Sequence, residues 1–480
     1  MNNKSNENEV LQARVQVKRP WLAMMALMIG AFVGMLSETS LNIALPQLMQ
    51  AFHVSNGIIQ WLVTGYMLVI GIVLPLSSLL TKWFTTRQLV IFGLIAFIIG
   101  AAISAIAPSF AILLTGRMIQ GIGTGIILPL MFTVAMQIFP PQKLGAAMGG
   151  CAMVIMLALA IGPTVTGLIL GVLSWRWVFW LSIPFLVIAL LFAIFELENT
   201  NELTKPKIDF LSIFESVIGF SCLVSGVSQA ADVGLTSPLV IGLLAVGIIV
   251  LAMYAHRQLS LEKPILNLRI FKVPAFRTGA VLVMLDFGII LSAMYLLPQY
   301  IQSGRLLAVS LTGIIMLPGG IINAAVSAFA GRAYDNIGAK KPAILGFILA
   351  LIGAGMLACL TPHSSIAYII AAHVILMIGC PLAMSPSQTY ALNAIQGPAS
   401  ADGSTIMNTL QQIVGAISTA IATGLLALGE KSFTGSKPAA FTHGVHYGLY
   451  FTLVLIICGL LLSLTIKKEE PSQDIELDKQ

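Results

Sequence analysis

Long hydrophobic runs separated by short polar breaks make up almost the whole chain. Most runs are about 20 residues long, which is the length that an α-helix needs to cross the roughly 30 Å hydrocarbon core of a bilayer. We therefore predict an all-α polytopic membrane protein with fourteen transmembrane helices. Their approximate ranges are 20–46, 58–80, 88–107, 110–138, 145–172, 177–195, 209–230, 236–256, 275–300, 309–331, 341–361, 365–393, 403–428 and 444–466.

The composition indicates a membrane protein rather than a soluble one. Of the 480 residues, 58% are hydrophobic and only 9% are charged, whereas soluble domains carry about 25% charged residues. A soluble protein of this composition could not cover its own surface with polar groups. Residues 1–19 are polar and lack a small-residue cleavage site, so we interpret them as an N-terminal tail rather than a signal peptide. Residues 467–480 are interpreted as a C-terminal tail.

The distribution of basic residues predicts the orientation in the membrane. If the N-terminus is cytoplasmic, 20 of the 25 Lys and Arg fall in inside segments and one, Arg117, falls within a span. The four that remain outside are Arg176, Arg305, Lys431 and Lys437. Because basic residues concentrate in cytoplasmic loops, we predict that both termini are cytoplasmic. The net charge of +6 follows from this rule and does not indicate a nucleic-acid partner.

Short segments recur at a nearly constant spacing, which predicts an internal repeat. Pro129 and Pro381 lie 252 residues apart in similar contexts, and the segments that begin at Ser78 and Gly331 lie 253 residues apart. A third pair, at the starts of two later helices, gives a spacing of 258. Parallel halves of six helices typically hold a substrate between them near the bilayer midplane. The predicted divisions are an N-terminal half, two extra helices with their loops, and a C-terminal half, at residues 20–195, 196–274 and 275–466.

Several motifs carry a resemblance to a known family. The first span contains SETSLNIALP from Ser37, the fourth RMIQGIGTG from Arg117 and the fifth IGPTVTG from Ile161. WRWVFWLSIP follows from Trp175, and a later loop reads GRAYDNIGAKK from Gly331. Together these motifs resemble those of the fourteen-helix drug:proton antiporters of the major facilitator superfamily, the EmrB/QacA type, over nearly the whole chain. The resemblance implies the major facilitator fold and export of lipophilic, often cationic, compounds in exchange for protons.

Two motifs depart from the family pattern. In the first span the usual acidic position is Ser37, and the acid comes one residue later at Glu38. That displacement turns the carboxylate about 100° around the helix. The first copy of the loop motif has Ser78, Lys82 and Thr85 where the family has Gly, Asp and Gly. The acid of the first span therefore faces a different side of its helix from the one that the family pattern implies.

Away from the ends of the predicted spans, four residues that are charged at neutral pH lie within them: Glu38, Arg117, Glu215 and Asp286. Such residues are costly in a membrane and usually functional. Glu38 and Arg117 both lie about 10–12 Å below the outer surface at roughly 1.5 Å per residue, so we expect them to approach each other, either as a structural pair or as a proton site. Asp286 lies near the midplane, where it could carry a proton or meet a cationic substrate. Glu215 lies near the inner end of the seventh span and could simply pair locally.

We predict three groups of site residues. Proton coupling is assigned to Glu38, Asp286 and Arg117. Substrate binding is assigned to Asp286, Glu38, Asn42, Gln120, Gln299 and Tyr300. Conformational gating is assigned, by resemblance, to Gly162, Pro163, Gly167, Gly331, Asp335, Gly338 and Lys340. For the gating residues the alternatives are close helix packing at the Gly-Pro motif and a solvated turn at the loop motif.

The sequence lacks a Gly-x-x-x-x-Gly-Lys-Ser/Thr phosphate loop and a His-Glu-x-x-His motif, so neither an ATP-driven pump nor a metal enzyme is indicated. We expect a multidrug efflux transporter, not an enzyme, in the plasma membrane of a bacterium. It needs no cofactor and no metal, and the proton gradient supplies its energy. The expected partners are small lipophilic substrates, protons and the lipid bilayer. The alternatives are a proton-coupled exporter of a lipid, fatty acid or metabolite, and a facilitator without coupling.

Overall fold

The computed structural model describes residues 19–54, 56–59, 61–200, 203–205, 209–234, 237–261, 264–395 and 399–467. Within these residues, fourteen segments are long and apolar enough to cross a membrane, which confirms the predicted number. The sixth is built from α8 and α9 together, and the ninth from α12 with the π-helix η3. The bounds are α2 (Pro20–Phe52), α3 (Asn56–Ile59), α4 (Trp61–Trp83), α5 (Thr86–Ile106), α6 (Phe110–Ile138), α7 (Leu144–Val172), α8 (Arg176–Trp180), α9 (Ser182–Phe195), α10 (Phe210–Val233), α11 (Pro238–Ser260), η2 (Leu268–Lys272), α12 (Pro274–Gln299), η3 (Tyr300–Gly304), α13 (Val309–Ile337), α14 (Lys340–Ala358), α15 (Ile366–Asn393), α16 (Ala399–Ser432) and α17 (Lys437–Ser463).

Local sequence determines several of the helix ends. Thr85 and Gln88 form a capping box at the start of α5, in which each side chain binds the other residue's backbone N–H. The Ser365 hydroxyl accepts a hydrogen bond from the backbone N–H of Tyr368 at the start of α15. α13 ends at Gly338, whose φ of 73° lies in the left-handed region that favours glycine. These ends produce short connections between consecutive helices.

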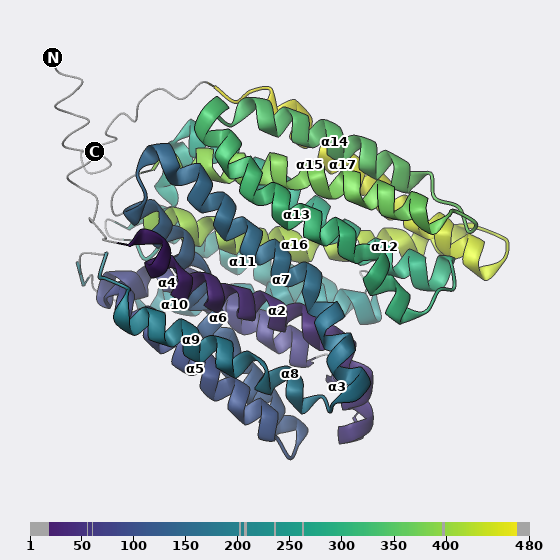
Figure 1. The fold of residues 1–480 in the computed structure, drawn as a ribbon, viewed down its shortest axis with the longest axis horizontal. Helices are drawn as coiled ribbons and strands as arrows, with labels where there is room; N and C mark the ends of the chain where they lie inside the picture. Colours follow the sequence, from purple (N-terminus) through teal and green to yellow (C-terminus); the bar gives the residue numbers. More distant parts are fainter. Residues whose placement is uncertain are drawn as a thin grey trace.

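The helices pack as two bundles of six. In the first, α5 packs on α6, and α2 contacts α6, α7 and α9. In the second, α14 packs on α15, and α12 contacts α15, α16 and α17. Figure 1 shows the purple-to-blue helices in the lower part of the molecule and the green-to-yellow helices in the upper part. The remaining helices, α10 and α11, pack on each other, and α10 also contacts α4 and α16, one helix from each half.

Two seams join the halves: α7 lies against α13, and α4 lies against α16. Glycine and alanine let the backbones of α7 and α13 approach closely, as is common between membrane helices. Gly331 of α13 meets Gly145 and Gly149 near one end of that seam, and Ala160 of α7 meets Gly320 farther along. The α7–α13 seam is therefore closed at both of these positions along the helices.

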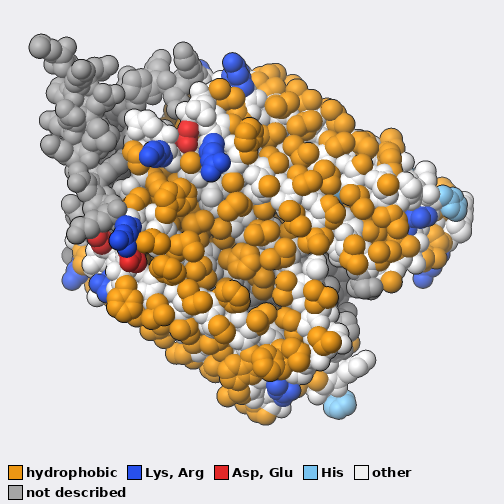
Figure 2. Space-filling view, viewed as in Figure 1, with side chains coloured by type: hydrophobic (Ala, Val, Ile, Leu, Met, Phe, Trp, Pro, Cys, Tyr) orange, Lys and Arg blue, Asp and Glu red, His pale blue; other side chains and the backbone are white. Residues whose placement is uncertain are grey.

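The two ends of the bundle differ in charge and in shape. α2 begins and α17 ends at one end, here called the basic end, where Lys and Arg side chains gather while the flank of the bundle is almost wholly hydrophobic (Figures 1 and 2). Toward the opposite end the outer parts of the two halves diverge, and a notch separates them in the space-filling view (Figure 2). The residues that define the basic end are Lys82, Arg87, Lys143, Arg257 and Lys340.

Candidate functional site

A polar cluster surrounds Arg117 inside the N-terminal half. Arg117 on α6 is fully buried, and its guanidinium lies 4.0 Å from the centre of the Tyr66 ring on α4. Its nitrogens donate hydrogen bonds to the Leu62 carbonyl (3.3 Å), the Ser37 hydroxyl (2.6 Å) and the Gln120 side-chain oxygen (2.7 Å). A buried charge is tolerated only when its donors are satisfied. The cluster satisfies this charge and ties α6 to α2 and α4.

Glu38 is not paired directly with Arg117. No ion pair joins the two in the described part of the chain, although they lie close enough for their charges to interact. Glu38 is 8% exposed, and its Oε2 atom has no hydrogen-bond partner among the described residues. The residue that does bind Arg117 is Ser37, at the position where the family pattern has its acid. The one-residue displacement therefore puts a hydroxyl rather than a carboxylate against Arg117 and leaves a buried acid beside it.

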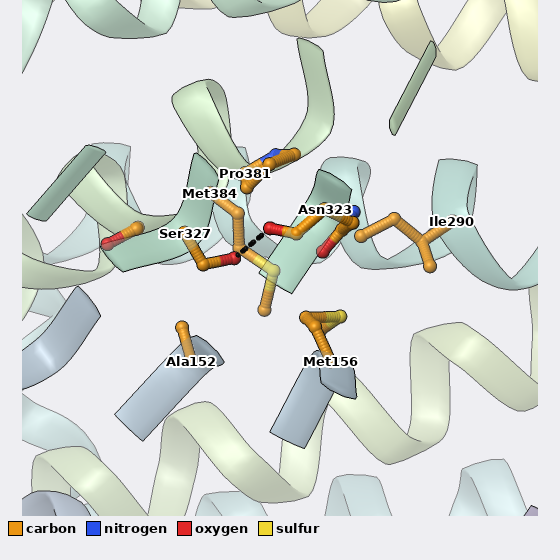
Figure 3. A pocket seen from close by; sticks show the side chains of 8 residues that line it. Ala152, Met156, Ile290, Asn323, Ser327, Pro381 and Met384 are labelled. Carbon is orange, nitrogen blue, oxygen red and sulfur yellow. Dashed lines mark hydrogen bonds between the residues drawn. The ribbon is translucent and has the colours of Figure 1, made fainter. Parts of the chain in front are cut away.

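A narrow cavity lies between the two halves near the middle of the α7–α13 seam (Figure 3). Met156 of α7 and Met384 of α15 border it, and its open space is too narrow to hold a water molecule. Asn323 and Ser385 also line it, and within the described residues the Asn323 Oδ1 atom and the Ser385 hydroxyl have no hydrogen-bond partner. The Ser327 hydroxyl donates to the Asn323 carbonyl at 2.8 Å (Figure 3). The cavity thus combines flexible methionines with unused polar groups, and it would have to widen to admit a ligand.

Asp286 of α12 does not itself line this cavity, but it lies next to residues that do. Ile290, one helical turn further along α12, lines the cavity. The thiol of Cys380 lies close to the Asp286 carboxylate, and the next residue, Pro381, also lines the cavity. Asp286 is fully buried, and neither of its oxygens has a hydrogen-bond partner of regular geometry in the described part of the structure. The N-terminal cluster and Asp286 are therefore separate sites on α2 and α12, one in each half.

The predicted gating loop contacts the other half at the basic end. The Asp335 carboxylate of α13 accepts hydrogen bonds from the backbone N–H groups of Gly145 and Ala146, both at 2.8 Å. These groups belong to the first turn of α7, where unpaired N–H groups and the helix dipole favour a negative charge. Gly331, one turn earlier, leaves room for the crossing, because a Cβ there would lie 2.0 Å from the Gly145 carbonyl oxygen. Asp335 and Gly331 therefore join the halves.

The other gating residues lie elsewhere. Gly162 packs against Thr39 of α2, within its own half, and its carbonyl accepts a hydrogen bond from Ser40 at 3.4 Å. Gly167 is exposed with no neighbour near its Cβ position. Gly338 ends α13, and Lys340 begins α14 with an exposed side chain. The side chain of Pro163 lies outside the described residues.

Three predicted binding residues differ in their surroundings. Tyr300 donates its hydroxyl to the Thr361 carbonyl at 2.6 Å, which joins η3 to the segment after α14, and it does not line the cavity. Gln299 is half-buried beside it. Gln120 belongs to the Arg117 cluster and keeps its Nε2 atom unpartnered among the described residues. The side chain of Asn42 lies outside the described residues.

Nothing in the sequence singles out Tyr66, Asn323 or Ser385. Their only signal is polarity within an apolar span, which many Ser, Thr and Asn residues of this chain share. What distinguishes them is the group that they face, and this depends on helix packing. Tyr66 also donates its hydroxyl to the Gly34 carbonyl at 2.9 Å, which fixes its ring beneath the guanidinium.

Two halves of six spans each, with two further spans beside them and buried acids on both sides of a central seam, are the plan of a membrane transporter. A model of the Major Facilitator Superfamily matches residues 27–419, and the chain belongs to this family.

Relatives of known name cover most of the chain. It is 45% identical over 456 residues to the lincomycin resistance protein LmrB of Bacillus subtilis, covering 93% of this chain and 95% of that protein. The LmrB protein of Listeria monocytogenes is 43% identical, with 94% and 97% covered. A multidrug resistance protein B homolog of Mycobacterium tuberculosis is 25% identical, with 81% and 73% covered.

A solved structure shares the fold. The crystal structure of the human organic anion transporter MFSD10 (TETRAN) matches with a TM-score of 0.67, covering 92% of this chain and 99% of that one. Sequence identity is only 14%, so this likeness concerns the arrangement of the helices and not the ligand.

Proposed function

We propose that this protein is a bacterial plasma-membrane exporter that removes lipophilic, often cationic, drugs from the cytoplasm or inner leaflet in exchange for protons, by alternating access. The observation that carries the proposal is the 45% identity to a lincomycin resistance protein along 93% of the chain. Lincomycin is therefore the first substrate to test. The polar and methionine side chains around the central cavity support an adaptable binding site.

Proton exchange is supported by the two buried acids. Glu38 and Asp286 each have at least one carboxylate oxygen without a hydrogen-bond partner in the described structure. A membrane-buried acid without a committed partner is costly when ionised and is usually functional. Glu38 lies near the fixed positive charge of Arg117, and Asp286 lies beside the cavity. We assign Glu38, with Arg117, to proton coupling, and Asp286 to both coupling and binding of a cationic group.

Alternating access requires that the seams open and close in turn. The Asp335 contact with α7 holds the basic end shut, while the opposite end carries the notch (Figure 2). We therefore assign Asp335 and Gly331 to closure of the cytoplasmic side. Opening of this side would expose the cavity to the cytoplasm and break the Asp335 contacts.

The test is drug accumulation in bacterial cells that lack their own drug pumps. Cells that express the protein should accumulate several-fold less labelled lincomycin, or less of a lipophilic cation, than cells with an empty vector. An uncoupler that collapses the proton gradient should abolish the difference while ATP is maintained. If the difference survives uncoupling, the transporter is not proton-driven. If no drug shows a difference but a lipid or metabolite does, the substrate class is wrong.

A further inference from the structure

The first copy of the loop motif, which departs most from the family pattern, makes an ion pair across the second seam. Lys82, in the last turn of α4, lies 3.3 Å from the Asp402 carboxylate in the first turn of α16. The Ser78 hydroxyl, one turn before Lys82, donates to the same carboxylate. α4 and α16 belong to different halves. We call the set Lys82, Ser78 and Asp402 the latch.

The latch occupies the place that the Asp335 contact occupies on the other seam. Ser78 and Lys82 correspond to Gly331 and Asp335 in the repeat, each 253 residues earlier. In the second copy of the motif the acid, Asp335, lies near the end of α13, and its partner is the start of α7. In the first copy the acid, Asp402, lies at the start of the partner helix, and the motif itself carries the base, Lys82, near the end of α4.

The exchanged positions of the acid and the base are both favoured by the helix dipoles. A cation is stabilised at a helix C-terminus and an anion at a helix N-terminus. Lys82 ends α4, and Asp402 lies in the first turn of α16. The Asp402 side chain is only 5% exposed, and that of Lys82 is 21% exposed. Removing one partner of such a shielded pair leaves the other charge uncompensated, which costs far more than loss of a surface pair.

The two extra helices reach the latch through a continuous set of hydrogen bonds. Lys82 Nζ donates to the Ile265 carbonyl at 3.2 Å, and the Ser78 hydroxyl oxygen lies 3.3 Å from the same carbonyl oxygen. The Ile265 backbone N–H donates to Gln258 Oε1 on α11 at 2.9 Å, and Leu266 N–H donates to the same oxygen at 3.3 Å. The segment that positions Lys82 is thus held by one fully buried glutamine.

Gln258 is in turn fixed by α10. Its Nε2 atom donates to the Ser212 hydroxyl at 2.6 Å, and Ser212 donates to Asp209 at 2.7 Å. Arg257 binds both Asp209 oxygens, at 2.8 and 3.0 Å. These bonds lower the pKa of Asp209, which lies just before the span Phe210–Val227, to about 2. The anchor is therefore ionised at neutral pH.

We propose that Lys82 and Asp402 form a charge-exchanged latch that closes the basic end on the α4–α16 seam, and that Gln258 is a positioning residue through which the two extra helices hold this latch in place. Opening toward the cytoplasm must separate Lys82 from both Asp402 and the Ile265 carbonyl. The extra helix pair thereby sets how readily that side opens. This inference rests on the proposed alternating-access cycle.

The test measures opening at the seam without any substrate. Thr133 of α6 is buried and hydrogen-bonds with Ser404 of α16 between the two halves, beside the α4–α16 seam. Thr133→Cys therefore serves as a reporter in a background whose five native cysteines are replaced by alanine. The measurement is the rate of labelling by a maleimide in membranes. Lys82→Asp and Asp402→Lys should each raise this rate at least about tenfold, as expected when a shielded pair is broken. The double variant, with the charges exchanged, should return to within about threefold of the parent.

The role of Gln258 is tested in the same way. Gln258→Leu should raise the labelling rate several-fold, whereas Ser216→Ala should leave it unchanged. Ser216 is a matched control, because it lies one turn from Ser212 on α10 and its buried hydroxyl has no hydrogen-bond partner among the described residues. An unchanged rate in Gln258→Leu would remove the extra helices from the inference.

Two variants distinguish opening of the seam from misfolding: the milder Lys82→Gln and the double variant in which the two charges are exchanged. Lys82→Gln removes the charge without introducing repulsion and should still raise the rate, in protein that remains monodisperse in detergent. If the single reversals label like the parent, or the exchanged pair does not recover, the latch does not exist. Because no drug or proton gradient is present, this result stands even if the accumulation test fails, and a failed latch leaves the accumulation result intact.

Discussion

The displacement of the acid from position 37 to position 38 has a physical consequence at Arg117. A guanidinium carries five N–H donors, and here they find Ser37, Gln120 and the Leu62 carbonyl rather than a carboxylate. An acid bound directly to Arg117 would be held ionised by it. Glu38, which feels that charge without being bound to it, is freer to exchange its proton when the surroundings change.

Glu38→Gln tests this residue, since glutamine has nearly the same shape and cannot ionise. We expect folded, inserted protein whose drug transport into inverted vesicles under an imposed pH gradient falls by about tenfold or more, within the usual range of coupling between two ligands. Glu215→Gln is the matched control. Glu215 is also 8% exposed and has a carboxylate oxygen without a hydrogen-bond partner among the described residues, but it lies on α10, outside both halves. Normal pumping with full proton coupling in Glu38→Gln would exclude Glu38 as the coupling site.

Asp286→Asn tests the acid beside the cavity. The change keeps the side chain's size and removes the charge that would meet a cationic substrate. We expect the apparent affinity for cationic drugs to fall by roughly tenfold or more, because a buried opposite charge is lost, while uncharged drugs lose much less. Concentration series of one permanent cation and one neutral drug in the same vesicles give the comparison. Equal effects on both classes would show that Asp286 does not recognise charge.

At the scale of helices, the sequence predicts which helices exist better than it predicts how the helices of the two halves align residue by residue. The fourteen spans follow from length and hydrophobicity alone. Gly93 of α5 and Gly346 of α14 make equivalent contacts 253 residues apart, the same spacing as at the loop motif. The pairing of Pro129 with Pro381 is one helical turn out of register. Gly123 packs on the Gly93 carbonyl, and its structural counterpart Gly379 packs on the Gly346 carbonyl. These contacts give a spacing of 256 in α6 and α15, not 252.

The corrected register shows why prolines misled the alignment. Proline can be accommodated at several positions of a membrane helix, whereas a close helix crossing accepts only a small residue. With a spacing of 256, Arg117 corresponds to His373. Arg117 lies over Tyr66, and His373 packs against Gly319, which is 253 residues after Tyr66. The two halves therefore preserve the site's geometry while its chemistry has diverged, and no comparison of residue types could reveal this.

The sequence predicts only part of the candidate site, because it reveals unusual residues but not the residues that they face. The buried charges Glu38, Arg117 and Asp286 could be found because any charge in an apolar span is unusual. Their partners could not be found, since which residue faces Arg117 depends on a rotation of about 100° per position and on the neighbouring helices. Lys82 and Asp402 were missed as a pair because they lie 320 residues apart at predicted span ends, where charges are ordinary.

At the scale of the whole molecule, the end at which Lys and Arg side chains gather is also the end at which polar contacts join the two halves. The Asp335 contact and the Lys82–Asp402 pair both lie at the basic end, and the notch lies at the other (Figure 2). If basic residues face the cytoplasm, this structure is closed toward the cytoplasm. The direction of transport that we propose therefore depends on the orientation in the membrane.

That orientation can be tested with two single cysteines in the cysteine-replaced background. Asn336 at the basic end and Ser436 at the opposite end both have exposed side chains, so each should react readily once a reagent reaches it. In intact cells a membrane-impermeant maleimide should label Ser436→Cys and spare Asn336→Cys, because the basic end should lie in the cytoplasm. Asn336→Cys should label to the same extent after the membrane is permeabilised, which controls for its reactivity. The reverse pattern in intact cells would place both termini outside, and the contacts at the basic end would then close the external side.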